Sequence, residues 1–90
     1  MFPTILDGAN VLYHTPAGHY GAVRLDTGEI ADYITFLAIC RYPDRSEYYL
    51  FSCNAEYEIV SDFPFEDIPA CMTSARLSCQ KDIQWIAAKR

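Results

Sequence analysis

Two histidines and four cysteines are the residues of this chain whose types could support chemistry. His14 and His19 flank the turn-like segment Thr15-Pro16-Ala17-Gly18. If the strands on either side of that segment pair as a hairpin, the two imidazoles approach each other, and a neighbouring cysteine would complete a metal site or a Cys–His pair. A small enzyme or metal-binding protein that uses His14, His19 and a cysteine is therefore one reading of the sequence.

The spacing of the cysteines is not that of a known site. They are Cys40, Cys53, Cys71 and Cys79, and no two of them form a C-x-x-C pair. The chain also has no G-x-S-x-G, H-E-x-x-H, Walker or dinucleotide glycine pattern. A reducing compartment is expected in the absence of an export signal, so we interpret the cysteines as small buried apolar residues. This interpretation expects no catalytic residue, no metal and no cofactor.

Acidic residues are concentrated between residues 44 and 67, where only Arg45 opposes them. They are Asp44, Glu47, Glu56, Glu58, Asp62, Glu66 and Asp67. One interpretation is an ordinary solvated surface; the other is a negative patch that steers a basic partner, with exposed tyrosines as anchors. For the second interpretation the predicted contact residues are Tyr42, Asp44, Glu47, Tyr48, Glu56, Tyr57 and Glu58.

Composition limits the class of protein. Ninety residues, 51% of them hydrophobic, predict one folded domain over residues 1–90. The formal charge of −5 disfavours nonspecific nucleic-acid binding, which needs clustered Lys and Arg. No stretch approaches the roughly 18 apolar residues of a membrane span. The first ten residues lack the basic region of a secretory signal. We expect a soluble cytoplasmic protein.

Turn signals at short intervals separate β-branched and aromatic runs, a pattern typical of an antiparallel meander. The runs cover residues 10–15, 20–25, 29–41, 47–53 and 57–60. Residues 30–34 are ambiguous between continuation of a hairpin and an irregular crossing. In the run 47–53, Tyr48, Leu50 and Ser52 share one face. The other face carries Tyr49, Phe51 and Cys53, so this strand is expected to be central and covered.

The period changes to that of a helix after Val60. Apolar positions then follow the spacing of one helix face at Ile68, Cys71, Met72, Ala75 and Cys79. Asp67 is a predicted N-cap, and Pro69 suits the first turn. Residues 82–88 predict a short strand, with a helical tail as the alternative. The expected fold is α+β: an antiparallel β-meander of about five strands with one C-terminal helix packed on a face.

Four segments resemble a set of small uncharacterised bacterial proteins that have a Y-L-F-x-C strand and a C-terminal helix. The segments are LDGANVLY (6–13), AICRY (38–42), YLFSC (49–53) and EIVSD (58–62). This chain has Tyr57 where such proteins often have Trp. Size, acidity and shape are also loosely similar to immunity-type proteins, which neutralise toxic bacterial enzymes. The resemblance carries no catalytic residue and no function residue by residue. The acidic patch and the lack of a catalytic motif, with the loose similarity to immunity-type proteins, lead us to expect an inhibitor or immunity-type protein that binds a basic protein partner.

Self-association is a further alternative. An unpaired sheet edge, or the tail around Trp85, would provide the surface for a homodimer.

Overall fold

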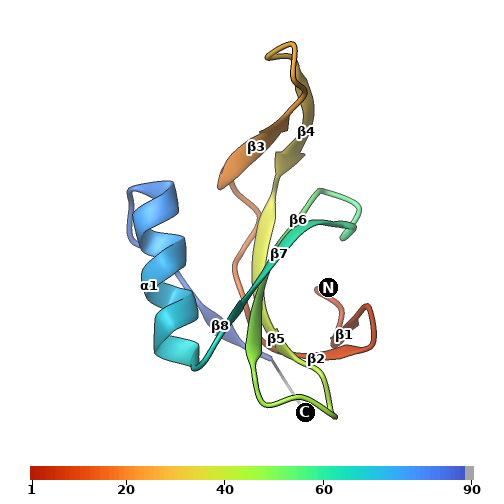
Figure 1. Ribbon diagram of the computed structural model, residues 1–90, viewed down its shortest axis with the longest axis vertical. Helices are drawn as coiled ribbons and strands as arrows, with labels where there is room; N and C mark the ends of the chain where they lie inside the picture. Colours follow the sequence, from red (N-terminus) through yellow and green to blue (C-terminus); the bar gives the residue numbers. More distant parts are fainter. Residues whose placement is uncertain (89–90) are drawn as a thin grey trace.

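A curled antiparallel sheet with one helix on a face makes up the body of the computed structural model, which describes residues 1–88 (Figure 1). The order of the main sheet is β1 (Ile5–Leu6), β2 (Ala9–His14), β5 (Phe36–Arg41), β6 (Tyr48–Cys53) and β7 (Ile59–Phe65), with β8 (Ile86–Ala87) paired to β2. A separate hairpin consists of β3 (Gly21–Arg24) and β4 (Ile30–Ile34), and the helix is α1 (Ile68–Cys79). The predicted α+β class, with about five sheet strands and a C-terminal helix, is confirmed.

Strands β5 and β6 are covered on both faces. Leu37, Ile39 and Leu50 pack with Cys71 and Ala75 of α1. On the opposite face, one cluster contains Leu6, Ala9, Val11, Ala38, Cys40, Phe51 and Cys53. The alternation predicted for residues 48–53 is confirmed, since successive side chains of β6 belong to these two separate cores.

The segment before β3 is a continuation of β2 rather than a hairpin turn. Thr15 N donates to Leu37 O of β5 at 3.0 Å, and the buried Thr15 hydroxyl accepts from Leu37 N at 3.0 Å. Farther on, Gly18 N donates to Thr35 O and Tyr20 N donates to Ile34 O, each at 3.0 Å. Residues 9–24 and 30–41 thus form the two sides of one long, bent hairpin.

The tip of that hairpin lies between β3 and β4, where Gly28 N donates to Leu25 O at 2.8 Å and Gly28 has φ +90°. Residues 30–34, left open by the sequence, are strand β4. The predicted run 29–41 divides at Thr35, whose N–H bonds to Cys53 O. Strands β3 and β4 therefore project beyond the main sheet as an arm (Figure 1).

Strand β7 is longer than the predicted run 57–60, because it continues through Pro64 to Phe65. Proline has no N–H to donate to the ladder, so Pro64 suggests from the sequence that the strand ends before it. β7 is the last strand of its sheet, and an edge strand tolerates proline because only one of its sides is paired.

The helix begins as predicted. Asp67 is its N-cap and accepts from Ala70 N at 2.8 Å, and Pro69 lies in the first turn. The chain leaves α1 at Gln80, which has a left-handed φ of 55°. Of residues 82–88, which the sequence predicts as a short strand, only Ile86–Ala87 form β8, and Ala88 N donates to Leu12 O. Within residues 1–88, no helix is long and apolar enough to cross a membrane.

Candidate functional site

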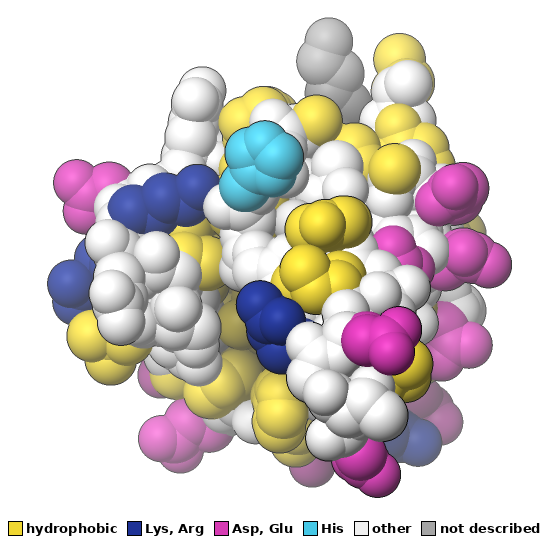
Figure 2. All heavy atoms as spheres, turned by 90° about the horizontal axis from the view of Figure 1, so that it is seen from above, with side chains coloured by type: hydrophobic (Ala, Val, Ile, Leu, Met, Phe, Trp, Pro, Cys, Tyr) yellow, Lys and Arg dark blue, Asp and Glu magenta, His cyan; other side chains and the backbone are white. Residues whose placement is uncertain are grey.

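The carboxylates of residues 44–67 are all exposed, but they do not form one patch. Asp44 and Glu47 lie in the loop between β5 and β6, whereas Glu56 and Glu58 lie in the turn between β6 and β7. Because β6 has six residues at about 3.3 Å each, the two groups are separated by roughly 20 Å. Viewed from the hairpin end, most of the visible acidic side chains lie on the side of the β6–β7 turn, although others lie on the helix side, and the basic ones lie mainly toward the helix side and the centre (Figure 2).

The β6–β7 turn is organised by Asn54, which is only 3% exposed. Its side-chain oxygen accepts from the backbone N–H groups of Glu56 (3.0 Å) and Glu58 (2.9 Å). Its amide nitrogen donates to Asp32 Oδ2 at 2.9 Å and to Glu58 Oε1 at 2.8 Å. One amide therefore brings two carboxylates from distant parts of the chain together. We call Asp32, Glu56 and Glu58 the turn cluster.

Aromatic rings support this turn from beneath. Tyr57 has a left-handed φ of 63° and stacks on Phe36, with ring centroids 5.0 Å apart. Phe2 packs edge-on against both of these rings, at 5.3 Å. Tyr57 is thus part of the scaffold of the turn. Of the predicted contact residues in this turn, Glu56 and Glu58 are the exposed ones.

The opposite end of β6 carries a more balanced group of charges. Tyr42 donates to Asp7 Oδ2 at 2.7 Å, and Arg45 Nη1 donates to Tyr49 OH at 2.9 Å. The Arg45 guanidinium lies 5.1 Å from the centre of the Tyr42 ring. The hydrogen bond to Asp7 is the main reason that the pKa of Tyr42 is raised to about 12.

Tyr48 lies at the same end as Tyr42 but on the helix side of the sheet, where the Arg41 guanidinium is 5.5 Å from its ring centre. The predicted residues Tyr42, Asp44, Glu47 and Tyr48 therefore lie close to Arg41 and Arg45. The two arginines offset part of the negative charge there, whereas at the turn the neutral Asn54 amide holds the carboxylates of Asp32 and Glu58, with Glu56 bonded through its backbone N–H.

The predicted approach of His14 and His19 does not occur through strand pairing, because β2 pairs with β5 and β8 and not with β3. The His14 ring stacks on Phe2 with centroids 4.4 Å apart, and its Nδ1 lies 3.0 Å from Thr15 O. His19 is exposed. In the described part of the chain, residues 1–88, no group of three or more His, Cys, Asp or Glu side chains is arranged to hold a metal ion.

The four cysteines are free thiols, and three of them are fully buried. Burial raises the pKa of Cys53 and of Cys71 to about 11, and it also raises the pKa of Cys40 and Cys79. Thiols with raised pKa values are poor nucleophiles at neutral pH. Burial confirms the interpretation of Cys40, Cys53 and Cys71 as small apolar residues.

Sequence reasoning missed Asp32, Asn54 and Asp7 as members of these groups. Asp32 lies 22 residues from Asn54 and is brought to it only by the bend of the long hairpin. An Asn after a strand does signal a turn, but nothing local indicates what its amide binds. Comparison with protein-family models, curated proteins and solved structures finds no match to this chain.

Proposed function

We propose that this protein is a small cytoplasmic binding protein, of the inhibitor or immunity type and not an enzyme, that recognises a basic surface of a protein partner. The turn cluster carries the proposal. Asn54 uses both of its amide hydrogens on carboxylates, so Asp32 and Glu58 are held in place before a partner arrives. Held charges lose little conformational freedom on binding, which favours recognition.

The electrostatics of the surroundings support the same surface. Arg24, Arg41 and Lys81 each donate to a backbone carbonyl oxygen, and Arg45 donates to a tyrosine hydroxyl. These four hydrogen bonds have neutral acceptors, so none of them neutralises a carboxylate of the turn cluster. The turn cluster keeps its negative potential, and such a potential accelerates the approach of a positively charged partner.

The size, acidity and sheet-plus-helix shape of the chain agree with its loose similarity to immunity-type proteins. Fold-level similarity is an analogy and adds less than the site does. A basic nucleic-acid-binding enzyme is the kind of partner whose surface would complement the two carboxylates held by Asn54 and the exposed Glu56 beside them.

The first step of the test isolates the partner. A photo-crosslinking residue at position 56, introduced in the native cell, is expected to capture a basic protein. The same residue at position 47 is expected to capture little of it. The captured protein is then purified, and its association with the unmodified chain is followed at several salt concentrations.

A matched pair of charge variants follows. Glu56→Lys with Glu58→Gln changes the net charge by +3 and keeps a side-chain acceptor for Asn54. Asp44→Lys with Glu47→Gln makes the same change at the opposite end of β6. We expect the first variant to lower the association rate constant about tenfold at low salt and to flatten its salt dependence, and the second to change it about twofold or less. Equal rates for both variants and the unmodified chain would overturn the proposal.

A further inference from the structure

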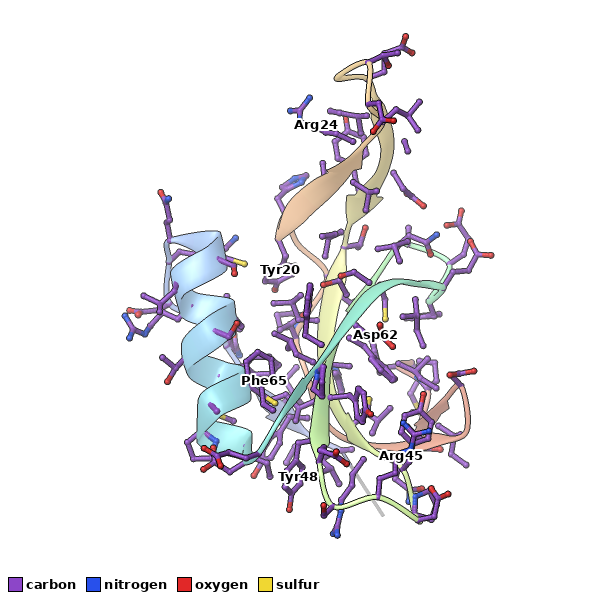
Figure 3. The ribbon with its side chains drawn as sticks, viewed as in Figure 1. Tyr20, Arg24, Arg45, Tyr48, Asp62 and Phe65 are labelled. Carbon is purple, nitrogen blue, oxygen red and sulfur yellow. The ribbon has the colours of Figure 1, made fainter. Side chains whose placement is uncertain are left out.

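A groove of about 400 Å³ lies between α1, the helix-facing side of β6 and β7, and the base of the β3–β4 hairpin. Its floor and sides include Leu37, Leu50, Phe65 and Ala75. In Figure 3, Phe65 lies between α1 and β7, and Tyr20 lies beside the base of the hairpin on the side of the helix. This volume falls at the smaller end of the range for sites that hold small organic molecules.

Hydroxyl groups line both walls of the groove. Ser52 and Ser61 are direct partners across β6 and β7, and Ser74 and Ser78 are one helical turn apart on α1. A helix packed on a sheet normally fills such facing positions with larger apolar side chains. Serines at these positions leave a space and place donors and acceptors around it.

The end of the groove is held rigidly by Tyr20. Its hydroxyl donates to Pro16 O at 2.9 Å, its carbonyl accepts from Cys79 Sγ at 3.4 Å, and the Lys81 ammonium lies 4.8 Å from its ring centre. The hydroxyl bond and the Lys81 contact hold the ring, and the Cys79 contact holds its backbone. The groove is therefore preformed and does not depend on rearrangement of the end wall.

The mouth of the groove exposes an aromatic ring. Phe63 lines the groove, yet it is 62% exposed, among the most exposed large apolar side chains of the molecule. Covering such a ring removes apolar surface from water and is favourable. A molecule seated in the groove would contact Phe63 and the floor beneath it at once.

We propose that this groove binds a small, uncharged, amphipathic molecule with an apolar or aromatic body and one or two hydrogen-bonding groups. The lining described here contains no Asp, Glu, Lys, Arg or His. An ionised ligand would lose hydration in a lining without charged side chains, because the nearby Lys81 ammonium is already bonded to His19 O and packed on the Tyr20 ring, whereas a neutral one needs only the serine hydroxyls. The site lies on the helix face, so it is independent of the turn cluster and of the function proposed for that cluster.

Two dyes with nearly the same ring system test the class of ligand. N-phenyl-1-naphthylamine is neutral, and 8-anilino-1-naphthalenesulfonate adds a permanent negative charge. We expect the neutral dye to show saturable 1:1 fluorescence enhancement and the sulfonate to bind about tenfold or more weaker. Equal binding of both dyes would overturn the assignment of a neutral ligand.

Substitutions locate the binding. Ser74→Leu fills the groove and should weaken binding of the neutral dye about tenfold, although it adds apolar surface. Ser46→Leu, in the exposed β5–β6 loop, adds the same side chain away from the groove and should leave binding unchanged. Nonspecific adsorption predicts the opposite for Ser74→Leu, namely equal or stronger dye binding, and that result would overturn the proposal.

A second variant covers the case in which Ser74→Leu fails to fold. Phe63→Ala removes an exposed ring from the mouth and leaves the buried core unchanged. We expect unchanged far-UV circular dichroism and weaker dye binding by about fivefold. Unchanged dye affinity in folded Phe63→Ala would overturn the site.

Discussion

Asn54 connects the β6–β7 turn to the hairpin arm through a single side chain. It is buried, and its four hydrogen bonds reach the β6–β7 turn and the hairpin arm. A buried amide left without its partners costs about 1–3 kcal/mol. The same bonds that shape the turn therefore also place Asp32 beside Glu58, so stability and the proposed binding surface depend on one residue.

The raised pKa of Tyr42 leads to a prediction at the residue scale. The phenol donates to Asp7, and the hydrogen bond favours the protonated form. The stability that this bond contributes is therefore fully present below pH 10 and is lost as the pH rises toward 12. Asp7→Asn should return the pKa of Tyr42 toward 10, as measured by ultraviolet titration of tyrosine ionisation.

Tyr42→Phe is the control for that titration. It should remove the ionisation step near pH 12 and leave the remaining tyrosine steps in place. An Asp7→Asn chain whose highest tyrosine step stays near pH 12 would show that the carboxylate is not the cause of the shift.

The N-terminus of α1 is an element whose stability depends on a local contact. Asp67 Oδ1 accepts from Ala70 N at 2.8 Å and satisfies one of the free N–H groups of the first turn. Asp67→Ala should lower the free energy of unfolding by about 1 kcal/mol, measured by urea denaturation. Asp67→Ser is the matched control, because serine keeps a capping oxygen, and it should cost a few tenths of that value or less. Equal losses for both variants would contradict the capping role.

The same helix shows which elements a sequence predicts well. Its cap, its early proline and its buried face at Cys71 and Ala75 all follow from residues within a few positions of one another. Pairing of β2 with β5 was beyond such reasoning, because it joins residues remote in sequence, such as Asn10 with Arg41 and His14 with Ala38. The extension of β7 was missed for a similar reason. Proline is tolerated there only because β7 lies at the edge, and sheet order is not a local property.

At the scale of the whole molecule, the predicted contact residues fall into two separate groups. The sequence indicated exposed acid at Glu56 and Glu58, and the structure places Asp44 and Glu47 at the other end of β6. Proximity along a chain misled the prediction, since a strand separates its ends by its full length. The hairpin arm supplies Asp32 from outside the predicted segment. The groove beside α1 likewise arises from the packing of elements that are remote in sequence.

The two cores of the molecule should melt together, because they share strands β5 and β6. Trp85 and Ile39 belong to the core beneath α1, and Val11 belongs to the opposite core. Adjacent side chains of β6 point into different cores. Loss of packing on one face therefore removes support for the strand that the other core also needs. Urea unfolding can be followed by Trp85 fluorescence and by the methyl signals of Ile39 and Val11. All three should give one midpoint, with the free energy of unfolding falling by about 1 kcal/mol per molar urea. A Val11 signal that persists after Trp85 fluorescence has changed would show instead that the curled sheet holds its inner core without the helix.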